Sequence, residues 1–362
     1  MHTTAPPGAK ASVGRSSVSI SDIARAAGVA SSTVSRALRD SPLISADVRA
    51  HIQRLAREMG YTPNGIAQSL QTRRTDTIGL VVTSIADPFF ADVANGVEEV
   101  ARPADLSVFL SSSHNDPAQE EAVIDLLHRR RVDGILVASS RMGEQALGQL
   151  TRLQVPIILI NSNAEAHVDR LHSVAVDDVL GARLAVDHLL QLGHRAIGYI
   201  GGANRPRAHR RRLEGYRSTL AAAGYAPPES WQMLAPGDDP AYTDDVAAGQ
   251  ALVRPLLEAG VTAVFCFNDM VATGVLLACR ELGLAVPGDL SIVGYDDIAL
   301  TRYLTPPLTT VHQPKLELGR AAMTMMLDLL GQRPVEDRVL QPTLLSRGST
   351  AAPRARSTKQ LS

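Results

Sequence analysis

The hydrophobic positions of this chain follow two patterns, and the change between them falls near residue 76. Residues 18–62 hold three short apolar runs at helical spacing, separated by a break at 28–30 and by a polar turn before Ser45. We expect Ser45 to cap the third helix, with Asp47 in its first turn. The apolar faces are Ile20, Ile23, Ala24 and Ala27, then Val34, Ala37 and Leu38, then Val48, Ile52, Leu55 and Met59. Three such helices can share one small core, and the first two predict a helix-turn-helix.

From residue 77 onwards, short continuous apolar runs alternate with amphipathic stretches. The predicted strands are 78–82, 107–110, 134–138, 156–160, 173–176, 196–200, 263–267 and 291–294. The predicted helices include 90–101, 118–129, 182–192, 210–223, 243–258 and 270–282. This alternation predicts an α/β fold in which helices cover both faces of parallel sheets. Because residues 76–350 exceed one usual domain, we expect two doubly wound lobes.

The second helix of the N-terminal part leaves chemically useful side chains outside its core. With Val34 and Ala37 facing inwards, Ser31, Ser32 and Arg36 lie on the outer face, where they suit base edges and phosphates. Residues 18–75 contain eight arginines and four acidic residues, a net charge of +4, whereas the whole chain is formally −1. The local excess of positive charge favours double-stranded DNA as a partner over a plain solvated three-helix bundle.

The order of residues in this stretch resembles a known family. The sequence D22-I-A-R-x-A-G-V-A-x-S-T-V-S-R36-x-L, then G60-Y-T-P-N64 and A67-Q-S-L70, is similar to the N-terminus of the lactose-repressor/galactose-repressor family of bacterial transcription factors. The resemblance implies that Ser31, Ser32 and Arg36 read the major groove and that Thr33 and Ser35 lie near phosphates. It also implies a hinge helix from Asn64 through Ala67 to Leu70, which folds on operator DNA and wedges Leu70 into the minor groove.

Elementary physics agrees with the hinge that the resemblance implies. A seven-residue helix is too short to be stable alone, so its ordering on DNA can act as a switch. A leucine is also a suitable wedge for kinking a base step. Two departures from the family are Ala30, where a capping serine is usual, and Gly65 in the hinge; each costs about 1 kcal/mol. Because Ser31 and Ser32 are small, we expect recognition of the DNA sequence to depend mainly on Arg36 and on DNA deformability.

Polar residues follow several predicted strands, where ligands bind in open α/β sheets. Carboxylates, amides and an aromatic pair suit a polyhydroxylated small-molecule effector, because bidentate groups bond adjacent hydroxyls while a ring stacks on the sugar. Each residue taken singly also has a simple interpretation as a helix cap. The candidate effector-binding residues at strand ends are Asp87, Phe89 or Phe90, Asn161, Asn268, Asp269 and Asp296.

The segment 201–217 is the second informative loop, with six arginines between 205 and 217. Its glycines match no dinucleotide or Walker fingerprint, so phosphate cradling is a weak interpretation. The motif R212-L-x-G-Y216 matches the family position whose arginine touches the effector, and Arg212 is therefore the candidate. The arginines leave an anionic effector, such as a sugar phosphate or sugar acid, open beside a neutral sugar or a nucleobase.

The resemblance extends from about residue 77 to 346, where the chain looks like a periplasmic sugar-binding protein built into a regulator. It is carried by Pro88-Phe-Phe90, Asn268-Asp269, Gly294-Tyr-Asp-Asp297 and Leu304-Thr-Pro-Pro-Leu-Thr-Thr-Val-His-Gln-Pro314. It implies lobe 1 at about 77–176 and 301–330, lobe 2 at about 177–300 and 331–347, and three crossovers that form a hinge. Ala208 and His209 depart from the family pattern, so no particular sugar follows.

The remaining features bound the function. The composition, 45% hydrophobic and 20% charged, is typical of a soluble globular protein, and we expect a cytoplasmic protein without signal peptide, membrane segment, cofactor or metal site. We expect disordered ends at 1–17 and 351–362, a linker at 63–75, and, without leucine heptads in the tail, a homodimer on a near-palindromic operator. A solute-binding protein does not explain residues 18–74. A sugar-converting enzyme needs an acid and a base, for which only Asp269 with Asp296 suggests itself.

Overall fold

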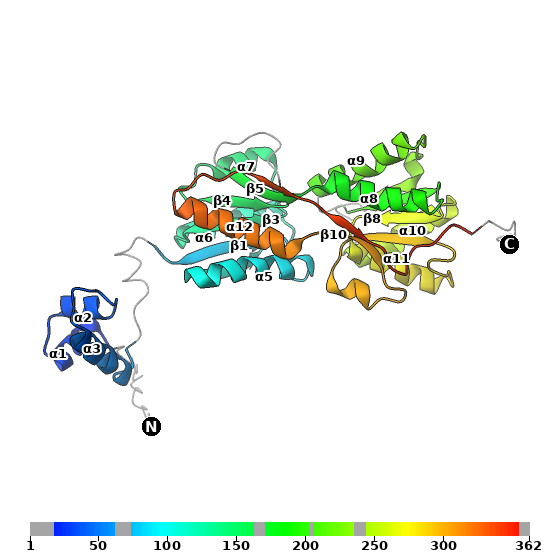
Figure 1. The fold of residues 1–362 in the computed structure, drawn as a ribbon. Helices are drawn as coiled ribbons and strands as arrows, with labels where there is room; N and C mark the ends of the chain where they lie inside the picture. The colour runs from blue at the N-terminus through cyan, green and yellow to red at the C-terminus, as the bar shows by residue number, and fades with distance from the viewer. Residues whose placement is uncertain (1–17, 62–73, 163–170, 203–205, 235–243, 355–362) are drawn as a thin grey trace, which may run out of the picture. The chain divides into compact units, whose positions relative to one another are not determined.

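The computed structural model describes residues 18–61, 74–162, 171–202, 206–234 and 244–354 (Figure 1). The chain divides into two compact units, Met1–Arg73 and Arg74–Ser362. The expected boundaries at 1–17, 63–75 and 351–362 fall wholly or mostly on residues outside these ranges and stay predictions.

The first unit consists of α1 (Ile20–Ala27), α2 (Ser31–Ala37) and α3 (Ala46–Glu58). Helix α1 begins with a capping box: Asp22 N–H donates to Ser19 Oγ over 3.3 Å, and Ser19 N–H donates to Asp22 Oδ2 over 3.0 Å. It ends at Gly28, whose φ of +67° favours glycine. The shared core consists of Ile23, Ala24, Val34, Ala37, Ile52 and Ala56.

Two expectations for α3 were wrong in detail. Val48 is 38% exposed, and Ala56 takes a place in the core instead. Helical spacing alone therefore overextended the buried face to Val48. Ser45 occupies the N-cap position, but its side chain makes no capping hydrogen bond.

The second unit contains two six-stranded sheets with the orders β11-β5-β4-β3-β1-β2 and β12-β10-β9-β8-β6-β7. All pairings are parallel except β10 with β12. The strands are β1 (Thr77–Val82), β2 (Ser107–Ser112), β3 (Gly134–Ala138), β4 (Ile157–Ile160), β5 (Leu171–Val176), β6 (Ile197–Gly201), β7 (Gln232–Leu234), β8 (Ala263–Cys266), β9 (Ser291–Asp296), β10 (Thr309–His312), β11 (Arg338–Leu340) and β12 (Thr343–Leu345).

Helices cover both faces of each sheet, as the continuous apolar strands predict (Figure 1). The helices are α5 (Phe89–Ala101), α6 (Pro117–Arg129), α7 (Glu144–Leu150), α8 (Asp178–Gln191), α9 (Pro206–Ala222), α10 (Asp245–Glu258), α11 (Asp269–Glu281) and α12 (Lys315–Leu330), with short 3₁₀ turns at Arg102–Ala104, Glu229–Trp231 and Ala299–Arg302. Helices α5 and α12 pack closely because Gly96 and Gly319 face each other's backbone, where an added Cβ would clash.

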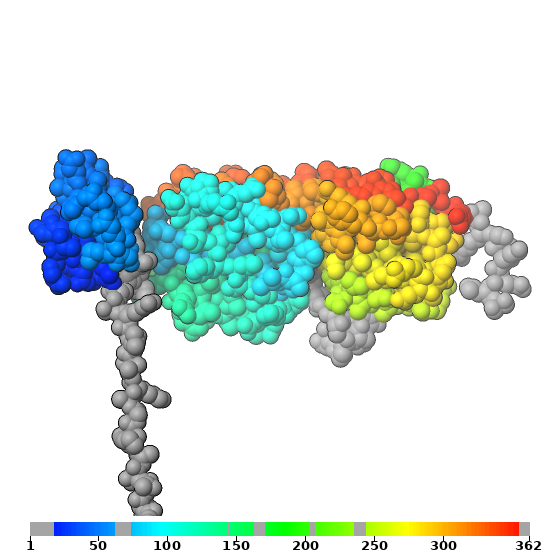
Figure 2. Space-filling view, turned by 90° about the horizontal axis from the view of Figure 1, so that it is seen from below, coloured from blue at the N-terminus to red at the C-terminus, as the bar shows by residue number. Residues whose placement is uncertain are grey.

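The chain passes between the lobes three times, near residues 177, 313–314 and 341–342. In the space-filling view, late segments in orange and red therefore lie over both the cyan and the yellow lobe (Figure 2). The expected lobe limits were wrong at the second and third crossings. Strand β10 belongs to lobe 2 because it pairs with β9, and β11 belongs to lobe 1 because it pairs with β5. The crossing follows the pairing of short strands, which sequence alone did not reveal.

Candidate functional site

Helix α2 presents the predicted DNA-reading face. Ser31, Ser32 and Arg36 are exposed, while Thr33 and Ser35 are half-buried. Arg39, which was not predicted, donates from Nε to Ser35 O over 3.1 Å and from Nη2 to Ser35 Oγ over 2.8 Å. Ser35 is thus already hydrogen-bonded. Within the described residues, the side chains of Ser31, Ser32 and Arg36 make no such bond, so they can bond DNA.

The start and the end of α2 are held differently. Ala30 at the N-cap makes no side-chain bond, as its departure from the family pattern predicted. At the other end, Gln53 of α3 donates to Ala37 O over 3.2 Å and to Asp40 Oδ1 over 2.9 Å. These bonds fix how α2 sits on α3, and with it the direction of the exposed face.

The predicted hinge residues Asn64, Ala67 and Leu70 lie outside the described residues. Their roles as DNA contacts stay predictions.

The carboxyl ends of the two sheets border an interlobe cleft with an inner pocket and an outer cavity. The inner pocket has a free volume of about 20 Å³, room for about one water molecule. It is lined by Phe89, Ser139, Ser140, Asn161, Asp178, Arg207, Ala208, Arg212 and Gln313. The outer cavity, of about 340 Å³, is lined by Ser84, Ala86, Asp87, Pro88, Asn115, Arg141, Gly202, Asp244, Asp245, Val246, Phe267 and Met270. Both hollows take residues from both lobes.

Arg212 is the centre of the inner pocket and is only 2% exposed. Its Nε donates to Asp178 Oδ1 over 2.8 Å, and its Nη1 donates to Phe267 O over 2.5 Å. The guanidinium lies over the ring of Tyr295, 3.6 Å from the ring centre. Burial opposes its charge, but the nearby Asp178, Tyr295 and Asp296 raise the pKa of Arg212 above its usual range. The cation is therefore permanent and its direction is fixed before any ligand enters.

A chain of hydrogen bonds leads from this arginine across the lobes. Arg212 Nη1 lies 3.9 Å from Asp296 Oδ1, which accepts from Gln313 Nε2 over 2.5 Å. Gln313 Oε1 in turn accepts from Asn161 Nδ2 over 3.0 Å, and Asn161 Oδ1 accepts from Val176 N–H over 3.0 Å. These hydrogen bonds involve residues at both the 177 and the 313–314 crossovers. They connect Arg212 to the interlobe hinge that the crossovers form.

Buried Lys315 reinforces the second crossover. Its Nζ donates to Asp296 O over 2.6 Å and to Asp297 O over 2.9 Å, and it lies 3.7 Å from Asp92 Oδ2. Lys315 belongs to α12 of lobe 1, and the two carbonyls belong to lobe 2. The lysine therefore fixes one point about which the lobes can rotate.

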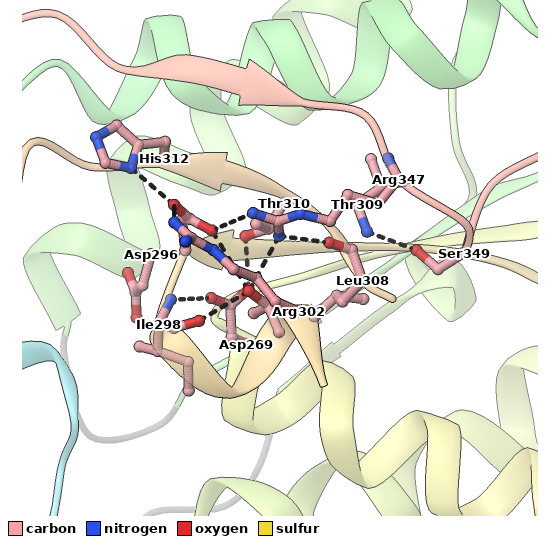
Figure 3. Close-up of polar contacts among 12 residues, drawn as sticks. Asp269, Asp296, Ile298, Arg302, Leu308, Thr309, Thr310, His312, Arg347 and Ser349 are labelled. Carbon is pink, nitrogen blue, oxygen red and sulfur yellow. Dashed lines mark hydrogen bonds and ion pairs between the residues drawn. The ribbon is translucent and has the colours of Figure 1, made fainter. Parts of the chain in front are cut away.

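Two predicted effector residues, Asn268 and Asp269, do not line either hollow. Asp269 is 1% exposed and accepts hydrogen bonds from Thr310 Oγ1 over 2.5 Å and from Ile298 N–H over 2.9 Å (Figure 3). Burial, followed by the charge of Asp296, raises its pKa well above the usual range. Asn268 caps α11 through Val271 N–H and donates to Asp245 Oδ2 over 2.6 Å. Both residues position the loops beneath the cleft.

The other predicted residues divide between lining and support. Phe89, Asn161 and Arg212 line the inner pocket and Asp87 lines the outer cavity. Phe90 is buried in the core of lobe 1, where it packs edge-on against Phe89. Asp296 is not among the lining residues of the two hollows, but it contacts the lining residues Gln313 and Arg212.

The arginine-rich segment contributes less to the cleft than its composition suggested. Besides Arg212, the inner pocket takes Arg207, whose Nη2 donates to Met142 O over 3.5 Å. Arg211 lies 3.9 Å from Asp177 Oδ1, and Arg217 donates to Gln232 Oε1 over 2.6 Å. Arg205 lies outside the described residues. Of the described arginines in the segment, Arg210, Arg211 and Arg217 are exposed, so most of these arginines lie on the solvated face of α9.

Sequence reasoning missed several lining residues. Asp178 comes two residues after β5, Gln313 directly follows β10 and Arg141 comes three residues after β3, so the strand-end rule could have found all three. Asp244 and Asp245 begin α10 and carry no strand-end signal, since β7 ends ten residues earlier.

Asp297 organises a second polar cluster behind the cleft. Its carboxylate accepts from Arg347 Nη2 over 2.6 Å and from His312 Nδ1 over 2.9 Å. Burial acts against its charge, but these bonds lower the pKa of Asp297 to about 2. Arg347 also donates to Leu308 O, and Ser349 Oγ accepts from Thr309 N–H (Figure 3). The cluster ties the C-terminal segment to lobe 2.

Within the described ranges, no three His, Cys, Asp or Glu side chains are placed to hold a metal ion. Among the same residues, no helix has the length and apolar character needed to cross a membrane.

Comparison with known families matches both parts of the chain. Residues 19–64 match a family described as bacterial regulatory proteins, lacI family. Residues 186–350 match a family described as a periplasmic binding protein-like domain.

Among similar proteins, the transcriptional repressor PurR of Serratia proteamaculans is 35% identical over 92% of this chain and 96% of its own length. The ribose operon repressor of Haemophilus influenzae is 36% identical over 91% of this chain and 97% of its own. Among solved structures, a lac repressor dimer bound to operator and an anti-inducer superposes with a TM-score of 0.83 at 27% identity, covering 93% of this chain and 100% of that one. A complex of the regulator CelR with cellobiose has a TM-score of 0.68 at 30% identity, covering 92% and 99%.

Proposed function

Since this chain belongs to the lacI family of bacterial regulatory proteins, we propose that it is an operon repressor whose affinity for operator DNA is controlled by a small sugar-class effector. Membership in the family makes it a DNA-binding regulator and not an enzyme. The observation that carries the proposal is the exposed Ser31, Ser32 and Arg36 face in the same chain as a cleft built around buried Arg212.

The DNA-binding function rests on the free face of α2. Arg36 can bond a guanine edge through two N–H groups, and short hydroxyls can bond either bases or phosphates. The lac repressor relative was solved as a dimer on its operator. We infer a homodimer that places two recognition helices on a near-palindromic site, with half-sites about one helical turn or a multiple of it apart.

The effector assignment rests on the chemistry of the cleft. Phe89 offers a ring face, while Asn161, Asp178 and Gln313, each already hydrogen-bonded within the protein, keep further amide or carboxylate positions that can bond a hydroxyl. CelR was solved with cellobiose, and a further relative, from Enterococcus faecium, was solved with ribose at 30% identity and a TM-score of 0.66, covering 77% of this chain and 100% of that one. Because the cleft has mixed polarity, a nucleobase or an anionic metabolite is the alternative ligand. The ligand screen distinguishes these classes.

Coupling between ligand and DNA follows from the crossovers. A ligand that bonds both lobes favours one arrangement of the lobes. The hydrogen bonds at residues 313–315 transmit this preference to the interlobe hinge that the crossovers form. Such coupling is typically about 1 to 3 kcal/mol and is reciprocal between the two ligands. We place the protein in the cytoplasm, where bacterial operator DNA lies.

The sugar-converting enzyme receives no support from the cleft. Asp269 is consumed by bonds to Thr310 and Ile298, and Asp296 by its bond to Gln313. Neither carboxylate lines the inner pocket or the outer cavity, so the described cleft does not place the two as acid and base beside a ligand.

Two experiments test the proposal. Thermal melting of the full chain against sugars, sugar phosphates, sugar acids and nucleobases should reveal a ligand, since one at 100 times its Kd stabilises by about 2.7 kcal/mol. Selection of bound sequences from random DNA should return a near-palindromic consensus. Failure to enrich any consensus would contradict the DNA-binding part, and a silent panel would contradict the effector part.

A further inference from the structure

The outer cavity contains a guanidinium whose hydrogen bonds are incomplete. Arg141 donates from Nη1 to Asn115 O over 3.0 Å and from Nη2 to Asn115 Oδ1 over 2.5 Å. Its Nε is buried and has no hydrogen-bond partner among the described residues. Nη1 and Nη2 each use one of their two N–H groups in these bonds, so each keeps an N–H that can donate to an oxygen atom of a ligand in the cavity. Arg141 thus differs from Arg212, whose bonds are made within the protein.

Arg141 is also held in place from behind. Its backbone N–H donates to Oε2 of Glu120, a side chain that is only 1% exposed. Burial lowers the pKa of Arg141 to about 10, while the carboxylates of Asp245 and Glu120 act in the opposite direction. The residue therefore remains a cation at neutral pH, with a fixed backbone and further N–H groups on Nη1 and Nη2 for a ligand.

The rest of the outer cavity is negative. Asp87 lies on the same lobe as Arg141, while Asp244 and Asp245 face it from the start of α10 on lobe 2. Asp244 Oδ1 accepts from Ala247 N–H, and Asp245 Oδ2 accepts from Asn268, so each carboxylate is fixed and keeps a further oxygen. Among the residues that line the outer cavity, three carboxylates against one guanidinium disfavour an anionic group. A hydroxyl avoids this cost, because it can accept from Arg141 and donate to a carboxylate at once.

We propose that Arg141 and Asp245 act as a specificity pair that binds an uncharged, hydroxyl-bearing part of the effector and excludes anionic groups from the outer cavity. The inference rests on the proposed function and narrows its ligand class to neutral polyhydroxylated compounds. Because Arg141 and Asp245 belong to different lobes, one ligand bonded to both holds the lobes together. The same pair thus sets specificity and favours closure.

Ring-matched probes test the pair on the full chain by titration calorimetry. Each set contains a neutral sugar and its phosphate ester, for several hexoses and pentoses and for cellobiose. We expect the neutral member of any binding set to bind at least about tenfold more tightly than its phosphate. Arg141→Gln should weaken the neutral sugar by about tenfold or more, and a double Asp244→Asn, Asp245→Asn variant should narrow the difference between sugar and phosphate.

A second arginine substitution keeps the test sharp if Arg141→Gln folds poorly. Arg141→Lys retains the charge but loses the two Nη groups that Asn115 holds in place, and it should still weaken binding of the neutral sugar. Arg102→Gln is the matched control, because the Arg102 side chain is 82% exposed and pairs only with Glu98 among the described residues. The control should bind like the unaltered chain. Melting of each variant without ligand separates lost binding from lost folding.

The outcomes separate this inference from the function on which it rests. Equal or tighter binding of the phosphate, or unchanged binding by folded Arg141→Gln and Arg141→Lys, would overturn the specificity pair and leave the repressor function intact. If the unaltered chain binds no probe and no nucleobase, the effector function fails, and the specificity pair fails with it.

Discussion

The recognition helix and the interlobe cleft differ in how they hold their functional side chains. On α2, Ser31, Ser32 and Arg36 are exposed and take no part in the core. In the cleft, Arg212 is 2% exposed and bonded to Asp178 and Phe267. The DNA-reading residues can therefore be exchanged at little cost in stability, whereas the cleft residues cannot.

This difference has a consequence for how the protein adapts. A recognition face free of structural duties can change operator preference residue by residue. A cleft built from buried, mutually bonded charges can change ligand only where a side chain is incompletely bonded, as Arg141 is. Substitutions on α2 should accordingly change DNA binding without changing stability. Substitutions of bonded cleft residues should change ligand binding and stability together.

The largest effect is expected from breaking the buried ion pair. Asp178→Asn removes the charge 2.8 Å from Arg212 Nε and leaves the guanidinium short of compensation. We expect the second unit to lose about 3 to 5 kcal/mol of unfolding free energy, measured by urea denaturation. Asp125→Asn on the exposed face of α6 is the control, with an expected change below about 0.5 kcal/mol. Equal effects would show that the cleft is no more constrained than the surface.

Substitution of Arg36 should change DNA binding without changing stability. Arg36→Ala should weaken operator binding by about 1 to 3 kcal/mol and relax the base preference at one position of each half-site. Fluorescence anisotropy with specific and random DNA measures both effects. Arg25→Ala, with an exposed side chain on α1, should weaken both DNAs alike, if at all. An unchanged consensus for Arg36→Ala would assign base reading to another residue.

The Asp297 cluster gives the cleft's surroundings a pH dependence that α2 lacks. Because the pKa of Asp297 is about 2 in the folded chain and 3.8 ordinarily, its bonds to His312 and Arg347 stabilise the fold above about pH 4. This contribution, about 1 to 2 kcal/mol, is lost as the pH falls towards 2. The stability difference between the unaltered chain and Asp297→Asn should shrink over that window. A difference independent of pH would contradict the assignment.

The smallest effect is expected from a substitution on α2 that changes stability without changing DNA preference. Ala30→Ser adds the missing capping oxygen at the start of α2 and should raise the unfolding free energy of the first unit by about 0.5 to 1 kcal/mol. The selected DNA consensus should stay the same. A changed consensus would mean that the start of α2 shapes specificity as well as stability.

Sequence reasoning found the elements well because they follow local periodicity. Three helices lie where the N-terminal apolar runs predicted them, and the strand Gly134–Ala138 has its expected bounds. It overextended the buried face at Val48 and misplaced β10 and β11 between the lobes, since both depend on partners distant in the chain. In the cleft, the strand-end rule identified residues near Arg212 but not which way their side chains point. Asp269 and Asn161 both follow strands, yet Asp269 faces Thr310 while Asn161 lines the pocket.

Control of operator binding by the cleft is the central claim, and its most direct measurement is reciprocal. Operator affinity is measured by anisotropy with and without the sugar identified by melting, and sugar affinity is measured by calorimetry with and without operator. We expect the sugar to change the operator Kd by about 5- to 150-fold, and the operator to change the sugar Kd by the same factor. A sugar that binds the cleft but leaves the operator Kd unchanged would contradict the claim.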